Sequence, residues 1–566
     1  MSSEHWLCCQ NLVLVVWWTG DGSTGLWLRR MENPDLCAGR RIAKAMKAQI
    51  VEIIRSVPYE GLRSGVGFDK IRGTRREMGS MKSKFIGRDA EMSQLAELWG
   101  KRTSSLVVCR GRRRIGKSTL IEEFAARSDC RFIEISGLPP DRKMTNQRQL
   151  DSFCERLSMQ IGCPRVKADS WQGAFALLAK AVGRRTKTVV LLDEISWMGK
   201  YDPAFPGELK NLWDLSLARR DNLVFFVCGS VSAWIQRNIL NNTGFVGRIS
   251  LEFVLGEMRL DDSVGFWGRM SKHLSCGEFF DVLSVTGAVP RYLEEINPRL
   301  SADENVRRMC FTSGGYLFRD FDRIFNDVFG ESHAIKREIM LALRSGPKTV
   351  SEIAQIAERA KNGHVSDHLV ELEKAGFLAS DEGVNPETGG KALALRYRIK
   401  DNYSRFYLRY VEPHREAIQK GVYFAPPLAE LPEWDTVMGL QFENLMLNHL
   451  SEFYERLGLD RARVLSIAPY RRAASVRNGP GVQIDLLVQT PKAYFVVEVK
   501  RKRRIGVEIE KEVEEKVSRL RVRKGVSVRT ALVYQGELDP QVKEDGYFSA
   551  LIDAESLLGQ LRAPQA

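Results

Sequence analysis

The stretch Gly111–Ser118, which runs Gly-Arg-Arg-Arg-Ile-Gly-Lys-Ser, limits what this chain can fold into more than any other feature. It matches the phosphate-loop pattern G-x-x-x-x-G-K-[ST] at every fixed position. The apolar run 105–109 before it predicts a strand, and the run 120–126 after it predicts a helix. A strand, a glycine-rich turn and a helix N-terminus in this order form a cradle for a triphosphate.

The side chains of this loop have separate expected roles. The glycines let backbone N–H groups approach phosphate oxygens. Lys117 is expected to bring a positive charge to the β- and γ-phosphates, and Ser118 to offer its hydroxyl to Mg²⁺. The expected nucleotide-binding residues are Gly111, Arg112, Arg113, Arg114, Ile115, Gly116, Lys117, Ser118 and Thr119, with ATP and Mg²⁺ as the cofactors.

Two further apolar runs end in polar residues and predict neighbouring strands of a parallel sheet that is buried on both faces. The first ends in Asp193 and Glu194. Because an acid at this strand end lies beside the phosphate loop, we expect Asp193 to hold Mg²⁺ and Glu194 to orient or activate the attacking water. The second run, 223–228, is followed by Ser230 and Ser232. Ser230 is the stronger candidate for sensing the γ-phosphate, and helix capping is the alternative role.

Length and composition set limits on the class of protein. A chain of 566 residues is expected to hold about three to five domains. The net charge of +14 suits a polyanionic partner such as DNA, although it also suits a protein that only avoids self-association. No apolar run approaches the roughly 20 residues that span a bilayer, so no membrane partner is expected. The ten Cys residues contain no C-x-x-C pair and are expected to be reduced, in a cytoplasmic protein.

The first 80 residues differ from the rest of the chain. They contain four of the 11 Trp residues and show no sustained helical or strand period. The apolar stretch 12–18 has no Lys or Arg before it, which argues against a signal peptide. Met81 then begins a segment typical of a natural start. Residues 1–80 are therefore expected to be disordered or to come from a start codon assigned too early, with a short accessory domain as the alternative.

The remaining chain is expected to be a multidomain α/β protein. Residues 81–255 alternate between strand and helix patterns, which predicts a P-loop core with a parallel sheet. Residues 256–330 are expected to form a helical lid. Residues 331–410 predict three helices and a β-hairpin, the plan of a winged helix-turn-helix. Residues 411–435 are expected to be a connector, and 436–566 mix helices and strands.

The predicted winged helix leaves two roles open. Thr349–Glu352 has the spacing of a capping box that opens the second helix, and three apolar residues between 365 and 372 share one face of the third. The residues expected to be exposed around the third helix are Lys361, Asn362, His364, Ser366 and His368. This helix could dock in the major groove of DNA, but it also carries three acidic residues, which favour packing against protein or sensing of nucleotide.

A second group of charged residues lies near the C-terminus. Glu498 and Lys500 point to the same face of a predicted strand, and pairing with the preceding strand places Asp485 beside them. Glu443, on an earlier predicted helix, is a candidate third acid. Asp485 and Glu498 are candidate metal ligands, and two carboxylates with an ammonium suffice to activate water for phosphodiester hydrolysis. The alternative is a charged sheet edge with no catalytic role.

The basic run Lys500–Arg504 continues this group. A run of like charges is usually a solvated face. Beside a candidate metal site it would instead contact nucleic-acid phosphates.

Taken in order, the motifs resemble the archaeal-type ATPases, which belong to the STAND branch of AAA+-like NTPases. The residues that carry the resemblance are Phe85–Met92, Gly111–Ser118, Leu191–Glu194, Gly244–Arg248 and Gly287–Leu293. The later part of the chain resembles the restriction-endonuclease-like, PD-(D/E)xK, domain often fused to these ATPases. That part of the resemblance rests on the winged helix, Tyr397–Asp401 with Phe406, Phe442, Glu443, Asp485 and Glu498–Lys500. The resemblance covers about residues 81–535.

The resemblance implies further site residues. Phe85–Glu91 would pack near the adenine, and Pro290 would contact the base. Arg248 would face the γ-phosphate in cis or from a neighbouring copy, which makes a homo-oligomer a candidate assembly. With Glu194 and Ser230, Arg248 completes the expected catalytic set. Three functions stay open: an ATP-driven switch that acts on DNA, an ATP-gated metal-dependent nuclease of a defence system, or a signalling scaffold whose tail binds only protein.

Overall fold

A computed structural model describes strands between residues 4 and 30 and most of 85–559. The parts of 85–559 left undescribed are 142, 185, 231–232, 330–331, 358–364, 391–394, 460–462 and 475–478. The chain divides into two compact units, Met1–Lys84 and Phe85–Ala566, each of which has its own internal packing. The described part contains no helix long and apolar enough to cross a membrane.

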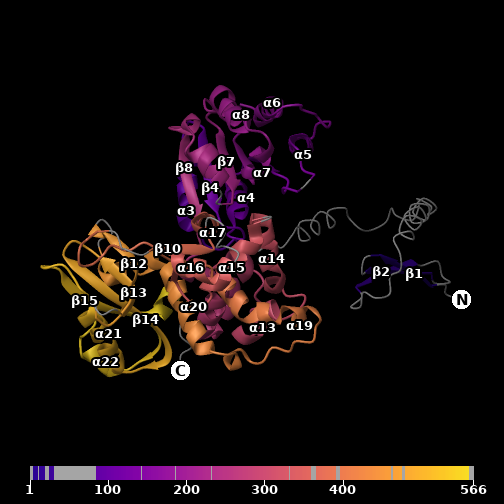
Figure 1. Ribbon diagram of the computed structural model, residues 1–566. Helices are drawn as coiled ribbons and strands as arrows, with labels where there is room; N and C mark the ends of the chain where they lie inside the picture. The colour runs from indigo at the N-terminus through magenta and orange to yellow at the C-terminus, as the bar shows by residue number, and fades with distance from the viewer. Residues whose placement is uncertain are drawn as a thin grey trace. The chain divides into compact units, whose positions relative to one another are not determined.

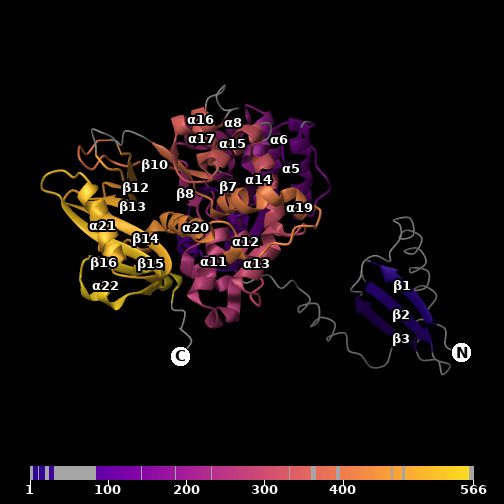
Figure 2. The same ribbon diagram turned by 60° about the horizontal axis from the view of Figure 1, so that its bottom comes forward.

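The first unit contains a small antiparallel sheet (Figure 2). Its strands are β1 (Glu4–Cys9), β2 (Leu12–Trp18) and β3 (Thr24–Arg30), with β2 in the centre. The three strands disagree with the expectation of disorder and suit the alternative of a short accessory domain, whereas the early start codon stays a prediction. The central strand is an unbroken apolar run rather than an alternating one, so it shows no two-residue period. Residues 31–84, including Met81, lie outside the described part.

A five-stranded parallel sheet forms the core at the start of the second unit, as predicted (Figure 1). Its strands are β4 (Ser105–Gly111), β5 (Arg131–Ser136), β6 (Thr188–Asp193), β7 (Leu223–Gly229) and β8 (Ile249–Leu255). They lie in the order β5-β6-β7-β4-β8, and all neighbours are parallel. Strand β7 therefore separates the strand of the phosphate loop from the strand that ends in Asp193.

Helices cover both faces of this sheet, because the inner strands are apolar on both sides. They are α3 (Asp89–Trp99), α4 (Lys117–Arg127), α5 (Asn146–Ile161), α6 (Trp171–Val182), α7 (Ile195–Met198), α8 (Phe205–Leu212) and α9 (Ala233–Ile235). The side chains of Thr145 and Ser170 cap α5 and α6 by accepting backbone N–H bonds. One buried cluster packs between α5, α6, α8 and the sheet, and a larger one continues into the following helices.

The segment after β8 is helical, as predicted. Its helices are α10 (Leu260–Ser263), α11 (Cys276–Thr286), α12 (Pro290–Leu293), α13 (Ala302–Cys310) and α14 (Tyr316–Phe329). Ser301 and Glu304 form a complete capping box at the start of α13. Buried aromatic residues of α11 and α14 join these helices to the core.

Three helices and a three-stranded sheet follow. They are α15 (His333–Leu343), α16 (Val350–Ile356), α17 (Val365–Lys374), β9 (Lys348–Thr349), β10 (Leu378–Asp381) and β11 (Arg396–Ile399). Thr349 and Glu352 form the predicted capping box. Helix α17 buries Val365, Leu369 and Leu372, as its spacing predicted. Lys361, Asn362 and His364 lie outside the described part, as does Ser232.

The segment 401–435, part of which was expected to be a connector, begins with a buried helix. Helix α18 (Asn402–Phe406) continues as a π-helix, Tyr407–Val411, and α19 (Arg415–Gln419) follows. The Asn402 amide donates to the carbonyls of Ser284 and Gln441, both at 2.9 Å. Helix α18 thus holds α11 to α20 (Trp434–Asn448), which carries Gln441. The predicted connector, residues 411–435, contains the short helix α19 and stays a prediction.

The last part of the chain is a five-stranded mixed sheet, drawn in yellow and orange (Figure 1). Its elements are β12 (Ser466–Arg472), β13 (Val482–Gln489), β14 (Ala493–Ile505), α21 (Glu508–Arg519), β15 (Ser527–Leu538), α22 (Pro540–Glu544) and β16 (Ala550–Asp553). Strands β12, β13 and β14 pair antiparallel, whereas β14, β15 and β16 pair parallel. Helix α20 packs on β14, which joins this sheet to the helices before it.

Candidate functional site

The phosphate loop connects the end of β4 to the start of α4. Its turn places Arg114 at φ 72° and Gly116 at φ 85°, both in the left-handed region. At Gly111, a Cβ atom would lie 2.6 Å from the carbonyl oxygen of Leu255, so this position requires glycine. The Lys117 ammonium donates to the carbonyls of Gly111 (3.1 Å) and Arg112 (3.2 Å) and so lies over the loop.

The predicted acidic strand end meets this loop. The Ser118 hydroxyl donates to Asp193 Oδ2 at 2.7 Å, and the backbone N–H of Glu194 donates to Asp193 Oδ1 at 2.9 Å. The Ser230 hydroxyl, at the end of β7, lies 3.5 Å from Glu194 Oε1. Four residues predicted from three separate motifs therefore lie close together. A hydroxyl and a carboxylate that meet here fit Mg²⁺, which takes oxygen ligands and completes its shell with phosphates and waters.

Glu194 occupies a strained and buried position at this site. Its φ of 49° is unusual for a residue other than glycine. Burial raises the pKa of its carboxyl, the Lys117 ammonium opposes this rise, and the Asp193 carboxylate adds to it. Among the described residues, Glu194 Oε2 is buried without a hydrogen-bond partner. A water molecule bound there would satisfy this oxygen and would also be placed to lose a proton to it.

Both segments expected near the base contact the phosphate loop. The Arg88 guanidinium donates to the carbonyl of Ile115 at 3.3 Å and to that of Gly256 at 2.7 Å. Pro290 Cγ lies 3.9 Å from the position that a Cβ would take at Gly116. The residue after this proline, Arg291, donates its backbone N–H to the Arg114 carbonyl at 3.4 Å.

Two family models match this chain. A family described as "ATPase domain predominantly from Archaea" matches residues 85–296, and one described as "Helix-turn-helix domain" matches residues 332–381. Residues 85–296 are an archaeal-type ATPase domain. The ATPase domain is followed by a helix-turn-helix domain.

Individual relatives are distant. The uncharacterized protein MJECL04 of Methanocaldococcus jannaschii is 20% identical over 371 residues, which are 65% of this chain and 77% of the relative. The Walker-type ATPase PABY2304 of Pyrococcus abyssi is 18% identical, with a TM-score of 0.39 over 58% of this chain and 97% of that one. The Aeropyrum pernix ORC2 protein, solved with ADPNP and ADP, is 15% identical, with a TM-score of 0.37 over 59% and 96%.

One expected catalytic residue lies elsewhere in the ATPase domain. Arg248 directly precedes β8, whose first residue pairs with Leu106 near the start of β4. The phosphate loop follows the other end of β4, and the seven residues of β8 span roughly 20 Å. Arg248 makes two hydrogen bonds with the Asp214 carboxylate, of 2.6 and 2.9 Å. The expectation that Arg248 faces the γ-phosphate in cis is therefore wrong, and a role towards a neighbouring copy stays a prediction.

The arginines in the variable positions of the loop make contacts that the motif does not predict. Arg112 bonds to Asp401 at 2.7 Å, and both side chains are almost fully buried. The same guanidinium lies over the ring of Phe377, 5.5 Å from its centroid. Phe377 follows α17, and Asp401 caps α18 by accepting the backbone N–H of Ser404. Arg112 therefore ties the phosphate loop to the helix-turn-helix domain and to the helix that follows it.

The other two arginines reach different elements. Arg113 lies over the ring of Trp197 in α7, 5.0 Å from its centroid. Arg114 bonds to the buried Asp320 of α14 at 2.8 Å and lies over the ring of Tyr316, at 5.6 Å. The phosphate-loop pattern accepts any residue at these positions, so only the run of three arginines itself hinted at such contacts.

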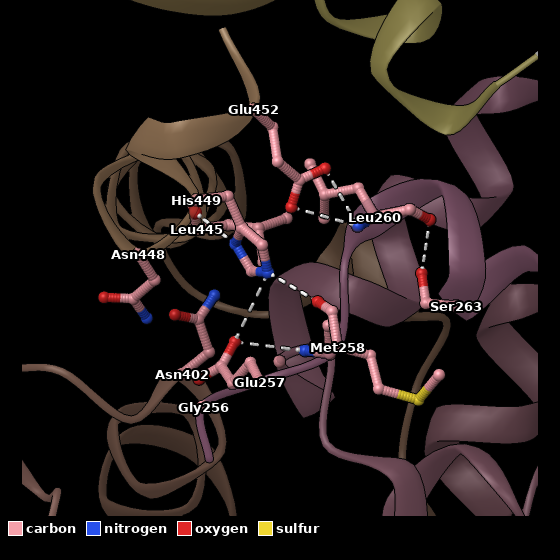
Figure 3. A network of polar contacts seen from close by, with 12 residues as sticks. Gly256, Glu257, Met258, Leu260, Ser263, Asn402, Leu445, Asn448, His449 and Glu452 are labelled. Carbon is pink, nitrogen blue, oxygen red and sulfur yellow. Dashed lines mark hydrogen bonds and ion pairs between the residues drawn. The ribbon is translucent and has the colours of Figure 1, made fainter. Parts of the chain in front are cut away.

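A second junction joins the ATPase domain to α20 (Figure 3). Both oxygens of Glu452 accept the backbone N–H of Leu260, at 3.2 and 3.1 Å. The buried ring of His449 lies 3.0 Å from the Met258 carbonyl and 4.0 Å from a carboxylate oxygen of Glu257. The segment after β8 is thus bonded to the residues that directly follow α20.

The predicted C-terminal acids are also brought together. Asp485 Oδ2 accepts the backbone N–H of Val499 at 3.0 Å, so its carboxylate lies beside the strand that carries Glu498 and Lys500. The Lys500 ammonium lies 3.0 Å from Glu498 Oε1. Burial raises the pKa of Asp485 to about 8, and the carboxylates of Glu498 and Glu443 add to the rise. Glu443 therefore lies close enough to Asp485 to affect its charge.

The sequence patterns did not predict one residue of this cluster. The Lys516 ammonium of α21 donates to both oxygens of Glu498, at 2.7 and 2.6 Å. Within the described part of the chain, no group of three or more His, Cys, Asp or Glu side chains is arranged to hold a metal ion. Metal binding by Asp485 and Glu498 would require Lys516 to move, and it stays a prediction.

The basic run 500–504 lies within β14 rather than after it. Arg501 forms an ion pair with Asp281, and the exposed Arg504 lies 3.3 Å from Asp539. Lys502 and Arg503 are exposed and open to solvent. Only part of the run is therefore placed as the phosphate-contact hypothesis requires.

Proposed function

We propose that this protein is a Mg²⁺-dependent ATPase whose nucleotide state switches a module that binds DNA. The observation that carries the proposal is the Arg112–Asp401 pair, which joins the phosphate loop to α18, while the same guanidinium lies over Phe377 of the helix-turn-helix domain. Arg114 makes a similar link to α14 through Asp320. A loop whose own side chains bond to neighbouring modules transmits the presence of a phosphate to them.

The catalytic part of the proposal follows from the side chains at the loop. The loop N–H groups and Lys117 bind the phosphates, and Ser118 and Asp193 would hold Mg²⁺. When bound, Mg²⁺ neutralises charge on the β- and γ-phosphate oxygens. Glu194 accepts a proton from the attacking water, and the Ser230 hydroxyl keeps the Glu194 carboxylate in place. The products are ADP and phosphate.

The switching part follows from competition for the arginines. The guanidinium groups of Arg112 and Arg114 are held by carboxylates, and a triphosphate in the loop offers them stronger, charge-assisted bonds. ATP binding would therefore weaken the links to Asp401 and Asp320, and loss of the γ-phosphate would restore them. The two nucleotide states then favour different positions of α14 and the helix-turn-helix domain.

The test is the affinity for a labelled duplex DNA, measured by fluorescence anisotropy without nucleotide, with ADP and with a non-hydrolysable ATP analogue. We expect affinities that differ at least fivefold between ADP and the analogue. Arg112→Ala should reduce this difference. Arg165→Ala, which removes an exposed ion pair with Glu155 in the same domain, is the matched control and should keep it. Equal DNA affinity in all nucleotide states of the wild-type protein would contradict the switch.

A second candidate function is an ATP-gated nuclease. It is supported by the contact of Asp485 with the backbone of Val499, which places this acid next to Glu498 and Lys500. The test is incubation of plasmid, single-stranded DNA and RNA with Mg²⁺ or Mn²⁺, with and without ATP. We expect cleavage that Glu498→Gln abolishes while ATP hydrolysis continues. No cleavage of any substrate by the wild-type protein would remove this candidate.

A further inference from the structure

A cationic pocket lies where the helix-turn-helix domain meets the C-terminal sheet. Its volume is about 400 Å³. Its walls come from β11, from the β12–β13 hairpin and from α21. The charged residues that line it are Arg396, Arg471, Arg472, Lys516 and Arg519, and no acidic residue lines it among those described. Three segments far apart in sequence therefore build one positively charged pocket.

Most of these cations are fixed by protein partners. Arg396 bonds to Glu352, Lys516 to Glu498 and Arg519 to Glu515. Arg472 donates to the carbonyls of Pro480 and Arg519. These bonds hold four of the five side chains in place, which favours a pocket that is shaped before a ligand binds.

Arg471 is the exception. In the described part of the chain, its guanidinium makes no hydrogen bond or ion pair. Burial lowers its pKa, and the nearby charge of Arg396 lowers it further, whereas Glu443 and Asp485 oppose this effect. These carboxylates, with Asp381, act on the guanidinium from a distance but do not bond to it, so its N–H donors have lost water without gaining a bonded acceptor. The chemistry that satisfies it is an oxyanion with planar, paired acceptors, such as a phosphate.

We propose that this pocket binds the phosphodiester backbone of the nucleic acid on which the protein acts. Five cationic side chains exceed what a single phosphate contacts. Three of them already bond to carboxylates, so successive phosphates would share or replace those partners. Lys516 lines the pocket and also bonds to Glu498, so a backbone in the pocket lies next to the C-terminal carboxylates. The exposed face of α17 carries Asp367 and Glu371, which makes it a poorer surface for the same backbone.

The proposal rests on the DNA-binding part of the proposed function, and it is tested on the full chain with single-stranded and duplex oligonucleotides. Arg471→Ala should weaken binding by at least about fivefold, because a charged hydrogen bond is lost. The dependence of log K on log salt should also become shallower by about 0.7 for single strands or 0.9 for duplexes. Arg102→Ala removes an exposed arginine outside the pocket and should leave binding unchanged.

Gln483 gives a test that does not depend on removing a buried group. Its side chain lines the pocket and is exposed, so substitutions there should fold normally. Gln483→Glu should weaken DNA binding, and Gln483→Lys should strengthen it. Effects of the same sign, or no effect of either variant together with normal binding by Arg471→Ala, would overturn the proposal.

Two further measurements separate the sources of failure. If tripolyphosphate binds in an Arg471-dependent way while DNA binding ignores Arg471, the pocket takes a small anion and the proposal is wrong. ATP hydrolysis by Arg471→Ala and Gln483→Glu should equal that of the wild type, because neither residue touches the phosphate loop. If the wild-type protein binds no DNA at all, the DNA-switch function fails as well. If it binds DNA without regard to these variants, only the pocket assignment fails.

Discussion

Lys117 shows how much of the nucleotide site depends on single side chains. Its ammonium is buried over the loop and donates to two backbone carbonyls, which a triphosphate would replace with charged oxygens. Lys117→Ala should therefore lower ATP affinity at least tenfold, or about 1.4 kcal/mol, as measured by calorimetric titration. Its circular dichroism spectrum and thermal transition should match the wild type. Unchanged ATP affinity in this folded variant would show that the loop does not bind the triphosphate.

Glu194 makes a prediction about pH. Its pKa is raised, chiefly by burial, so its carboxyl keeps a proton at a higher pH than an ordinary glutamate does. A general base must be deprotonated, and ATP hydrolysis should accordingly fall on acidification at a higher pH than an ordinary glutamate would cause. The acidic limb of the kcat profile measures this. Glu194→Gln should bind ATP but hydrolyse it poorly at every pH, and wild-type turnover by this variant would assign the base to another residue.

At the scale of elements, the sequence predicted best those parts whose patterns are local. Strands β4, β6 and β7 were found because buried parallel strands are continuous apolar runs, and each ends at a chemically distinctive residue. The capping box at Thr349 and the apolar face of α17 were found for the same reason. The closeness of Asp485, Glu498 and Lys500 also followed from strand alternation, once the two strands were placed side by side.

The contacts that the sequence did not predict join residues that are far apart along the chain. Arg112 and Asp401 are 289 positions apart, and nothing in either segment indicates that they meet. The cis role of Arg248 failed because its motif does not show at which end of β8 the arginine lies. Lys516 was not predicted because its helix carries many charged residues, and the sequence does not show which of them faces Glu498. The cationic pocket was not predicted either, because its lining comes from three segments that are far apart in sequence.

The pairing of the loop with α18 can be tested as an interaction between elements. In a double-mutant cycle, Arg112→Ala and Asp401→Asn should each destabilise the protein, and the pair should be non-additive by about 1 kcal/mol or more, because the two charges are buried together. Asparagine at 401 retains an oxygen that can accept the Ser404 N–H and so preserves the helix cap. Urea unfolding measures the free energies. Additive effects would show that the pair does not couple the two elements.

At the scale of the whole molecule, the first 84 residues form a unit of their own. A protein that begins at Phe85 keeps every described contact of the nucleotide site. It should therefore fold, bind ATP with wild-type affinity and show the same main thermal transition in calorimetry. Lys117→Ala in the truncated protein is the control for nucleotide binding. Loss of ATP binding or aggregation of the truncated protein would show that the first unit supports the second.

The position of Arg112 has a consequence that runs in both directions. If Arg112 bonds to Asp401 in one nucleotide state and to a phosphate in the other, as proposed, ATP and DNA are thermodynamically linked. If ATP changes the affinity for DNA by some factor, DNA must change the affinity for ATP by the same factor. The ATP concentration at half-saturation would then report the local concentration of nucleic acid, and the ATPase domain would act as a sensor of DNA as much as its driver.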